Sequence, residues 1–473
     1  MKRARCLSTR INDPRISVAH HLGYTFSAAA FVLGCSVQRS ELVTTAPDNG
    51  TGGNGSAITE LFADAATAAA IERVVNERPI GGASLGTGTN GGGSLAEAQG
   101  NGRVYWVDSE AALLSAVSGD TPAILLILEG VYDFTLVPGR ASKACSVACT
   151  PNTPVATQTL ASSSCETTAT LFSTYSTYET ARVGNNKTII GLGKGATLRN
   201  LRLDLSGSSN VIVRNLALTD VNPGIFHDGE GIQLAPADHV WIDHCTFKNE
   251  SYTSVRIVSS WSETNQQALT TLAGYVTLSW NHFDGRTSKA CGGQDPTVLS
   301  ANRVPGLTLH HNWFDTTDNW NPYLLGPGTW AHIFNNTWSN VTSVSVGVTC
   351  GATALLEGNS FDNARDSVYI SDSGAPTWAF CQAGLFGRAF APSALADDQQ
   401  NLIDANSAMS LNGQPVDGSN IQLPSRLSGH AFQAQVPASA LGDPAATYEY
   451  SLEAMPSGVS EKLKVTAGAG HLF

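Results

Sequence analysis

An asparagine recurs at the ends of short hydrophobic strands in the second half of this 473-residue chain. The asparagines are separated by 31, 24 and 23 residues, and they are Asn281, Asn312, Asn336 and Asn359. Repeats of this size with one short strand each are typical of a solenoid, whereas a β-propeller needs four strands and about 40–50 residues per repeat. The pattern therefore predicts an all-β chain folded as a right-handed parallel β-helix. The asparagine side chains are expected to stack from rung to rung and to bind the backbone at the bend.

The first 102 residues have a different composition from the rest. Residues 1–35 begin with basic residues and continue with an apolar stretch, which is typical of an export signal peptide. The segment ends in VLGC, which resembles a lipoprotein signal with Cys35 as the lipidated residue, and an ordinary cleaved signal fits equally well. Residues 36–102 are rich in Gly, Ser, Thr and Ala, and they are predicted to form a flexible linker with a short helix around residues 60–76.

Residues 103–473 are predicted to form one domain. A strand is expected at 104–107, an N-capped helix at 109–117 and a buried strand at 123–128. Residues 396–473 lose the repeat, and we expect them to pack back on the solenoid as a tail rather than to form a second domain.

The composition narrows the choice of partners. Only 14% of the residues are charged, and 46 glycines accompany 3 methionines, which favours an all-β chain over a helical one. The net charge of −12 argues against nucleic acid as a partner. Nine cysteines in an exported chain indicate disulfides, with Cys145, Cys149 and Cys165 in one loop as candidates, and the lack of paired CxxC motifs argues against a zinc site. A monomer is expected.

Two carboxylates mark the candidate site. Asp228 and Glu230 are two residues apart, so on an extended strand both would point to the same face. The next strand carries a Trp-Ile-Asp-His run, in which we interpret Asp243 and His244 as a structural pair.

Several segments resemble the pectate lyase and pectin lyase family of polysaccharide lyases, and the ending at 448–470 resembles that of bacterial members. These segments are 186–193, 210–216, DGEGI at 228–232, VWIDH at 240–244 and the Asn-aromatic strand ends. The resemblance covers about residues 103–470. It implies a single-stranded pectin lyase-like solenoid that cleaves homogalacturonan (pectin or pectate) by β-elimination in a groove on one outer sheet.

The reaction needs two kinds of group. Removal of the proton at C5 builds negative charge on the C6 carboxyl, so one group must accept the proton and another must stabilise the charge. The resemblance implies that pectate lyases use Ca²⁺ held by acidic residues, and that pectin lyases, whose methyl esters are neutral, do without it. Asp228 and Glu230 match the first pair of calcium carboxylates, but the second pair falls on Tyr252 and Arg256. Arg256 would place a fixed charge at the calcium position, or it would pair with the two carboxylates across neighbouring rungs. The predicted cofactor is therefore none or Ca²⁺, with Asp228 and Glu230 as its candidate ligands, although Ca²⁺ takes six to eight oxygens.

The catalytic arginine of the family is the main departure. By the spacing to Pro322 it falls on Trp320, which cannot accept a proton, and the second arginine falls on Leu325. The loop at 284–291 resembles the pectin lyase loop at which pectate lyases have a substrate-binding lysine. The candidate catalytic residues are therefore Arg256, Arg286 and Lys289, and the candidate substrate-binding residues are Asp228, Glu230, Tyr252 and Trp320.

Two classes of function follow. The first is a secreted or cell-surface lyase acting on pectic polysaccharide. An acidic, Trp-lined groove would favour the methyl-esterified form of this polymer. Membrane contact is expected only through a lipid anchor at Cys35. The second is a non-catalytic β-helix that binds plant cell-wall polysaccharide, because Trp320 replaces the arginine.

Overall fold

The structure is a computed structural model. It describes residues 64–134, 147–150, 157–160, 178–221, 229–250, 252–259, 273–286, 297–302, 304–318, 320–326, 329–349, 352–370, 394–397, 402–403, 408–411, 414–416, 448–453 and 456–473. The chain divides into two units, Met1–Gly55 and Ser56–Phe473, and all described residues belong to the second. The predicted signal peptide lies outside the described residues, as do Asp228 and Lys289. Over the ranges that are described, no helix has the length and apolar character needed to cross a membrane.

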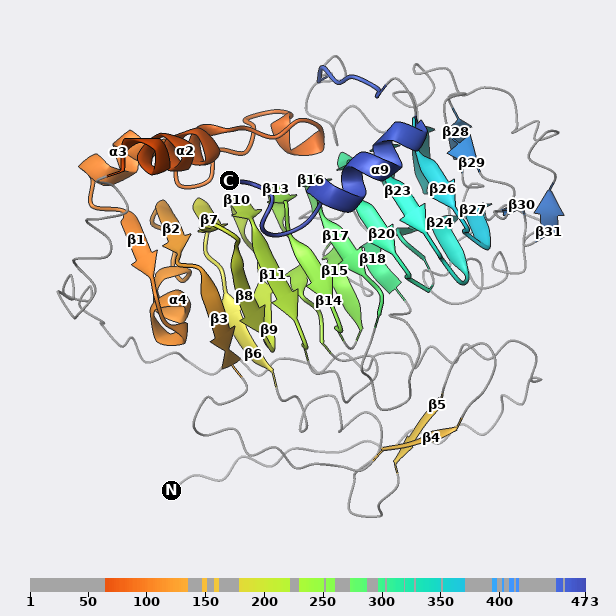
Figure 1. Cartoon of the computed structure of the whole chain (residues 1–473), viewed down its shortest axis with the longest axis horizontal. Coiled ribbons are helices and arrows are strands. Elements are labelled where there is room, and N and C mark those ends of the chain that lie inside the picture. Colours follow the sequence, from red (N-terminus) through yellow and green to blue (C-terminus); the bar gives the residue numbers. More distant parts are fainter. Residues whose placement is uncertain are drawn as a thin grey trace, which may run out of the picture. The chain divides into compact units, whose positions relative to one another are not determined.

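Three long sheets form the walls of a solenoid (Figure 1). The strands of sheet A are β1 (Val104–Val107), β2 (Ala123–Ile127), β7 (Lys187–Gly191), β10 (Ser209–Arg214), β13 (Asp238–Asp243), β16 (Gly274–Ser279), β19 (Leu307–His310), β22 (Trp330–Phe334), β25 (Thr353–Glu357) and β28 (Ala394–Asp397). The strands of sheet B are β3 (Gly130–Asp133), β8 (Ala196–Arg199), β11 (Leu216–Thr219), β14 (Thr246–Lys248), β17 (His282–Asp284), β20 (Trp313–Asp315), β23 (Thr337–Ser339), β26 (Ser360–Asp362) and β29 (Leu402–Ile403).

The strands of sheet D are β6 (Glu179–Arg182), β9 (Leu201–Asp204), β12 (Ile232–Leu234), β15 (Thr253–Val258), β18 (Thr297–Asn302), β21 (Tyr323–Leu325), β24 (Val344–Thr349), β27 (Asp366–Ile370), β30 (Ala408–Leu411) and β31 (Gln414–Val416). A small sheet C pairs β4 (Val147–Thr150) with β5 (Thr157–Leu160). Neighbours within sheets A, B and D are parallel, except for the antiparallel pair β30–β31. The chain visits D, A and B in turn on each rung, as in β12, β13 and β14. The predicted right-handed parallel β-helix is therefore confirmed.

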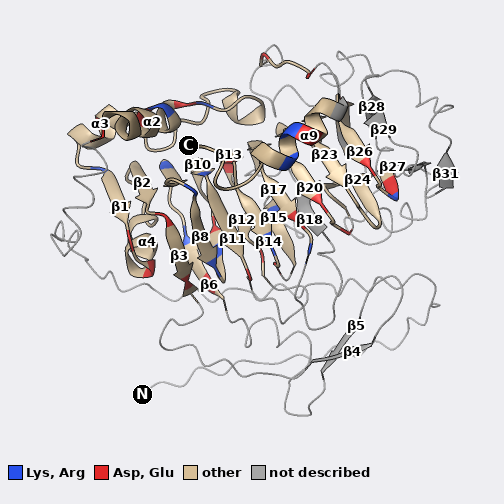
Figure 2. Ribbon diagram, viewed as in Figure 1, with Lys and Arg blue, Asp and Glu red and all other residues tan. Residues whose placement is uncertain are grey.

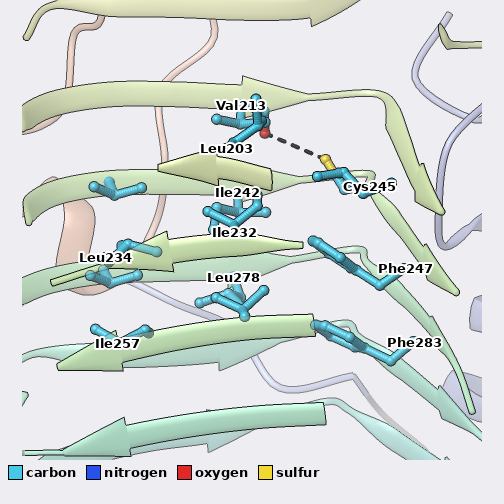
Figure 3. Close-up of a cluster of buried hydrophobic side chains, with 14 of the residues drawn as sticks. Leu203, Val213, Ile232, Leu234, Ile242, Cys245, Phe247, Ile257, Leu278 and Phe283 are labelled. Carbon is cyan, nitrogen blue, oxygen red and sulfur yellow. Dashed lines mark hydrogen bonds between the residues drawn. The ribbon is translucent and has the colours of Figure 1, made fainter. Parts of the chain in front are cut away.

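Inward-facing side chains of successive rungs stack on one another to form the core. On sheet B the rings of Phe247, Phe283 and Phe314 follow one another with centroids 5.0 and 4.7 Å apart, and Trp338 and Phe361 continue the column. Figure 3 shows the first two rings beside aliphatic side chains of sheets A and D, with the buried thiol of Cys245 above them in this view. Parallel in-register pairing places equivalent positions one above the other, about 4.8 Å apart, which suits ring stacking.

The recurring asparagines form the predicted ladder between sheets A and B. Asn281, Asn312, Asn336 and Asn359 are fully buried. Each side-chain Nδ2 donates to the next Oδ1, at 2.9, 2.9 and 3.1 Å in turn, and each of these Oδ1 atoms also accepts a backbone N–H. The ladder thus satisfies the backbone groups that the bend would leave unpaired.

The start of the solenoid also follows the sequence. β1 and β2 occupy the predicted strands, and α4 (Glu110–Ala116) begins at the N-cap Ser109, whose side chain accepts the Ala112 N–H. The helix buries Leu113 against the open end of the core.

Residues 64–102, here called the N-terminal strap, lie across the outer face of sheet A. The strap contains α2 (Ala65–Asn76), the 3₁₀ turn η1 (Gly82–Ser84) and α3 (Leu95–Gly100). α2 packs its apolar side, including Ile71, against outward side chains of β2 and β7. Farther along, the backbone N–H groups of Gly82, Ala83 and Gly92 donate to threonine hydroxyls of the sheet at 2.9, 3.0 and 2.9 Å.

The predicted flexible linker is therefore wrong for residues 64–102, although its short helix is confirmed by α2. A glycine-rich composition usually indicates flexibility, but here it permits close packing. A Cβ on Gly82 would lie 1.7 Å from the carbonyl oxygen of Gly306, and one on Gly92 would lie 2.3 Å from that of Ala123. Only glycine lets the strap approach the strands this closely.

The end of the chain forms a second cover, here called the C-terminal strap (residues 448–453 and 456–473). Its helix α9 (Pro456–Thr466) packs Val459 and Leu463 against Trp280 and Trp313. Leu472 joins the cluster of α2, so these residues pack back on the solenoid. The predicted loss of the repeat from residue 396 is wrong for β29 and β30, which continue sheets B and D. Figure 2 shows basic and acidic residues interspersed along the described elements, with both kinds on α9.

Candidate active site

A row of outward-facing positions crosses sheet D along the axis of the solenoid. Their neighbours on the same strand are fully buried in the core, as Val255 and Ile257 are on either side of Arg256. Side chains alternate along a strand, so the row points outward. In strand order the row is Gln233, Arg256, Ser300, Tyr323, Gly347 and Tyr369, each in register with the next. The row is polar at one end and aromatic at the other.

The polar end is built around Glu230, which lies two residues before β12. Its side chain is only 8% exposed and accepts a hydrogen bond from Arg202 Nη1 at 3.1 Å. Arg256, on the next rung, approaches the other carboxylate oxygen at 3.8 Å. The predicted pairing of Glu230 with Arg256 across neighbouring rungs is thus confirmed, and Arg202 is a partner that the sequence analysis missed.

Tyr252 lies beside this cluster. Its N–H donates to the carbonyl of Gly229 at 3.1 Å, which places it next to Glu230. Burial raises the pKa of the Tyr252 phenol, although Arg256 opposes this effect. The phenol is therefore neutral near pH 7 and can act as a hydrogen-bond donor.

Trp320 occupies the aromatic end. Its backbone has a φ of 59°, in the left-handed region that a tryptophan rarely adopts, and its N–H donates to the carbonyl of Val344 at 2.7 Å. The ring lies over Gly347, where a Cβ would be 2.1 Å from a ring carbon. Tyr323 and Tyr369 flank it, with ring centroids at 4.7 and 5.3 Å. The position at which the family has its catalytic arginine thus carries a fixed aromatic ring.

The second arginine position holds Leu325, which is 8% exposed on β21. Both arginine positions of the family are therefore uncharged in this chain, and Arg256 is the predicted catalytic residue that the row on sheet D contains.

Arg286 lies on a different wall, just after β17 of sheet B. Its guanidinium binds the carboxylates of Asp284 and Asp315, the latter at 2.8 Å. Burial would raise the pKa of Asp284, but hydrogen bonds from Arg286 and Lys248 outweigh it and lower that pKa. The structure thus places Arg286 in an ion-pair network of sheet B and does not bring it together with Glu230 and Arg256.

The Trp-Ile-Asp-His run lies on sheet A and is structural, as predicted. Asp243 is 1% exposed and binds Arg214 at 2.7 Å, the Ser279 hydroxyl at 2.6 Å and His244 Nδ1 at 2.7 Å. Arg214 also stacks on Trp241, with 4.1 Å between the guanidinium carbon and the ring centroid. These contacts join neighbouring rungs, and the run lies on a different sheet from the row on sheet D.

Glu230 is poorly suited to hold Ca²⁺. The ion needs six to eight oxygens, and a cation at this carboxylate would face the guanidinium groups of Arg202 and Arg256. Among the described residues no group of three or more His, Cys, Asp or Glu side chains could hold a metal ion.

Comparison with known proteins agrees with the fold. A family model described as pectate lyase matches residues 58–472. The probable pectin lyase F-2 of Aspergillus terreus is 31% identical over 301 residues, which make up 61% of this chain and 57% of that protein. The probable pectin lyase F of Emericella nidulans is 32% identical over 48% of each chain. This chain thus spans about half the length of these curated relatives.

A solved structure of the pectate lyase pelN from Paenibacillus sp. 0602 superposes with a TM-score of 0.52 at 17% identity, over 83% of this chain and 96% of that one. Likeness at this level supports the β-helix fold. Since the family model covers the solenoid together with both straps, the chain belongs to the pectate lyase family.

Proposed function

We propose that this protein is a polysaccharide lyase that cleaves homogalacturonan by β-elimination in the groove on sheet D. The observation that carries the proposal is that Arg256 and the aromatic group of Trp320, Tyr323 and Tyr369 lie along one outward row. Successive rungs are about 4.8 Å apart, a spacing similar to the length of one sugar unit, so a linear chain can follow the row. The aromatic faces suit sugar rings, and the guanidinium suits a carboxyl group.

The chemistry at Arg256 follows from charge. Loss of the C5 proton leaves an electron pair that forms the C4–C5 double bond, and the C4–O4 bond breaks. The leaving oxygen then takes a proton. Negative charge builds on the C6 carboxyl during the first step, and a guanidinium facing it stabilises that charge. Arg256, whose side chain is 36% exposed, has the position for this role.

For the proton acceptor, we propose Lys289, because Arg256 acts through the positive charge of its guanidinium and cannot also accept the proton. Arg286 is bound to two carboxylates on sheet B, which makes it the weakest of the three candidates. Replacement of each by an uncharged residue tests the assignment. The variant that lacks the proton acceptor is expected to lose turnover, whereas Arg286→Gln is expected to keep it.

We propose further that the reaction is independent of Ca²⁺ and prefers methyl-esterified polymer. The paired arginines at Glu230 support this, because a fixed positive charge already stands where the family's ion would bind. A neutral ester also avoids repulsion from an acidic protein. Asp228, which lies outside the described residues, would then bind substrate and not a metal.

One assay tests these statements. Ultraviolet absorbance of the unsaturated product is followed on high-ester and low-ester pectin, each with and without chelator. We expect product from high-ester pectin with chelator present. Loss of the signal on chelation would show calcium dependence through Asp228 and Glu230.

The second candidate function is a non-catalytic β-helix that binds plant cell-wall polysaccharide. Trp320 favours it, because a ring held over Gly347 cannot accept a proton. No product on any substrate, together with binding of oligogalacturonate in calorimetry, would establish it. Trp320→Arg should then create or raise turnover if the groove is otherwise intact.

The location is also a proposal. The basic start, the apolar stretch and VLGC at 32–35 support an exported bacterial protein anchored through lipid on Cys35. Mass spectrometry of the mature amino terminus and detergent partition of wild type and Cys35→Ser test it. Equal partition of both into the aqueous phase would exclude the anchor.

A further inference from the structure

The carboxylate of Glu230 lies between two arginines on neighbouring rungs, and the two contacts differ. Arg202, on β9, donates to Oε2 at 3.1 Å, which is a charge-assisted hydrogen bond. Arg256, on β15, stands 3.8 Å from Oε1, which is too long for a hydrogen bond. Glu230 is therefore bound chiefly by Arg202.

Arg202 is itself fixed from behind. Its Nη1 donates to the hydroxyl of Tyr178 at 3.1 Å, and its guanidinium carbon lies 5.1 Å from the centroid of that ring. The Arg202 side chain is 20% exposed, against 36% for Arg256. The inner arginine is thus anchored in the wall, and the outer one is more exposed on the outer face of sheet D.

We propose that Arg202 is a positioning residue, which neutralises Glu230 and so keeps the Arg256 guanidinium available to the substrate. The inference rests on the proposed function of the groove. A carboxylate that is 8% exposed needs a cationic partner. Without Arg202 the nearest described cation is Arg256, which would close from 3.8 Å to hydrogen-bond distance and turn away from the polymer.

The charge count supports the same role. Two guanidinium groups and one carboxylate leave a net charge of +1, and with Glu230 held by Arg202 that charge is carried by Arg256. A cation already paired with Glu230 would have little left to offer the carboxyl of the sugar, whose charge develops only during the reaction.

The test compares four variants for turnover on the best pectin substrate and for melting temperature. Arg202→Gln should lower kcat by about tenfold or more with a smaller change in KM, because charge stabilisation in the transition state is lost. Arg202→Lys, which keeps a cation beside Glu230, should recover most of the loss. The matched control is Arg199→Gln, since Arg199 lies three residues away on sheet B and pairs with the half-buried Asp133 and Asp220. It should leave turnover unchanged.

The double variant separates positioning from folding. Arg202→Gln with Glu230→Gln removes the carboxylate that would capture Arg256, so its kcat should exceed that of Arg202→Gln alone by about fivefold. If Arg202 only supports the fold, the double variant recovers melting temperature, but kcat per folded molecule is the same in the double and the single variant. The inference is overturned if wild type is active and Arg202→Gln stays within about twofold of it, or if the double variant is no faster than the single one.

The proposed function can fail separately. If wild type forms no product but binds oligogalacturonate, the same four variants are compared by calorimetry, and Arg202→Gln should weaken the dissociation constant by about tenfold while the double variant recovers affinity. Unchanged affinity refutes the positioning role. If wild type neither cleaves nor binds, the function and the inference both fall.

Discussion

The buried ion pair between Arg214 and Asp243 ties the N-terminal strap to the solenoid. Both side chains are 1% exposed, and the atoms Nη2 and Oδ2 lie 2.7 Å apart. The same arginine reaches the strap, with Nη2 2.8 Å from the Glu77 carboxylate and Nη1 donating to the carbonyl of Val74 at 2.8 Å. We therefore expect Asp243→Asn to destabilise the fold and to loosen the strap.

The magnitude follows from what the substitution leaves behind. Asp243→Asn strands a buried guanidinium whose remaining charged partner, Glu77, is 47% exposed and screened by water. Removing one member of a buried pair costs about 3–5 kcal/mol, whereas a half-exposed pair contributes about 0–1 kcal/mol. The free energy of unfolding should thus fall by about 3–5 kcal/mol in Asp243→Asn and by no more than about 1 kcal/mol in Glu77→Gln.

Equilibrium unfolding in urea, followed by circular dichroism, gives both values, and limited proteolysis near Glu77 reports on the strap. A double variant, Arg214→Met with Asp243→Leu, should cost less than Asp243→Asn alone, because no unpaired charge stays buried. If Asp243→Asn lowers the free energy by less than about 1 kcal/mol, the pair contributes nothing of note and the reasoning is refuted.

Three further predictions concern single positions. Gly347→Val should displace the Trp320 ring, lower the free energy of unfolding by about 1–3 kcal/mol and weaken polysaccharide binding in calorimetry. The control Gly458→Ala has open space around the new Cβ and should stabilise α9 by about 0.4–1 kcal/mol. Equal polysaccharide affinity of the two variants would contradict the role of the ring. Asn336→Ala should cost about 2–4 kcal/mol in urea unfolding, since it unpairs buried donors of the ladder; a loss under about 1 kcal/mol would show that water replaces them. Burial lowers the pKa of His310 to about 3, so the folded state resists its protonation while the unfolded chain protonates near pH 6.5. The free energy of unfolding should fall as pH drops from 6.5 towards 3, and His310 alone should account for about 2–3 kcal/mol of this loss at pH 4.5. In His310→Leu the melting temperature should depend less steeply on pH than in wild type. The same dependence in both proteins would contradict the prediction.

Much of the fold could be read from the sequence, because a solenoid repeats its own signal. The asparagine at each bend needs the same hydrogen bonds on every rung, so Asn281 and Asn312 announce a periodic structure. The N-terminal strap gave the opposite signal. Its glycines serve close approach to strands that come later in the sequence, and composition alone cannot distinguish that use from flexibility.

The site was predictable only in part for a related reason. Glu230 and Arg256 stand on adjacent rungs and could be paired from the sequence. Arg202 and Tyr178 come from the preceding rungs, and their partners depend on the register between strands, which is set by turns of irregular length. The signal available in the sequence was that Arg202 alternates with the apolar Leu201 and Leu203, which places it outward on the rung before Glu230. The spacing to Pro322 picks out Trp320 in the sequence, but the position of its ring over Gly347 depends on three-dimensional packing.

The strap across sheet A has a practical consequence. It begins at Asp64 and packs through α2 on a wall of the solenoid other than the one that carries the row on sheet D. A fusion partner or a resin linker joined upstream of Asp64 is therefore attached away from the groove. Beads loaded through this end would leave the groove open to long polymers in the surrounding solution.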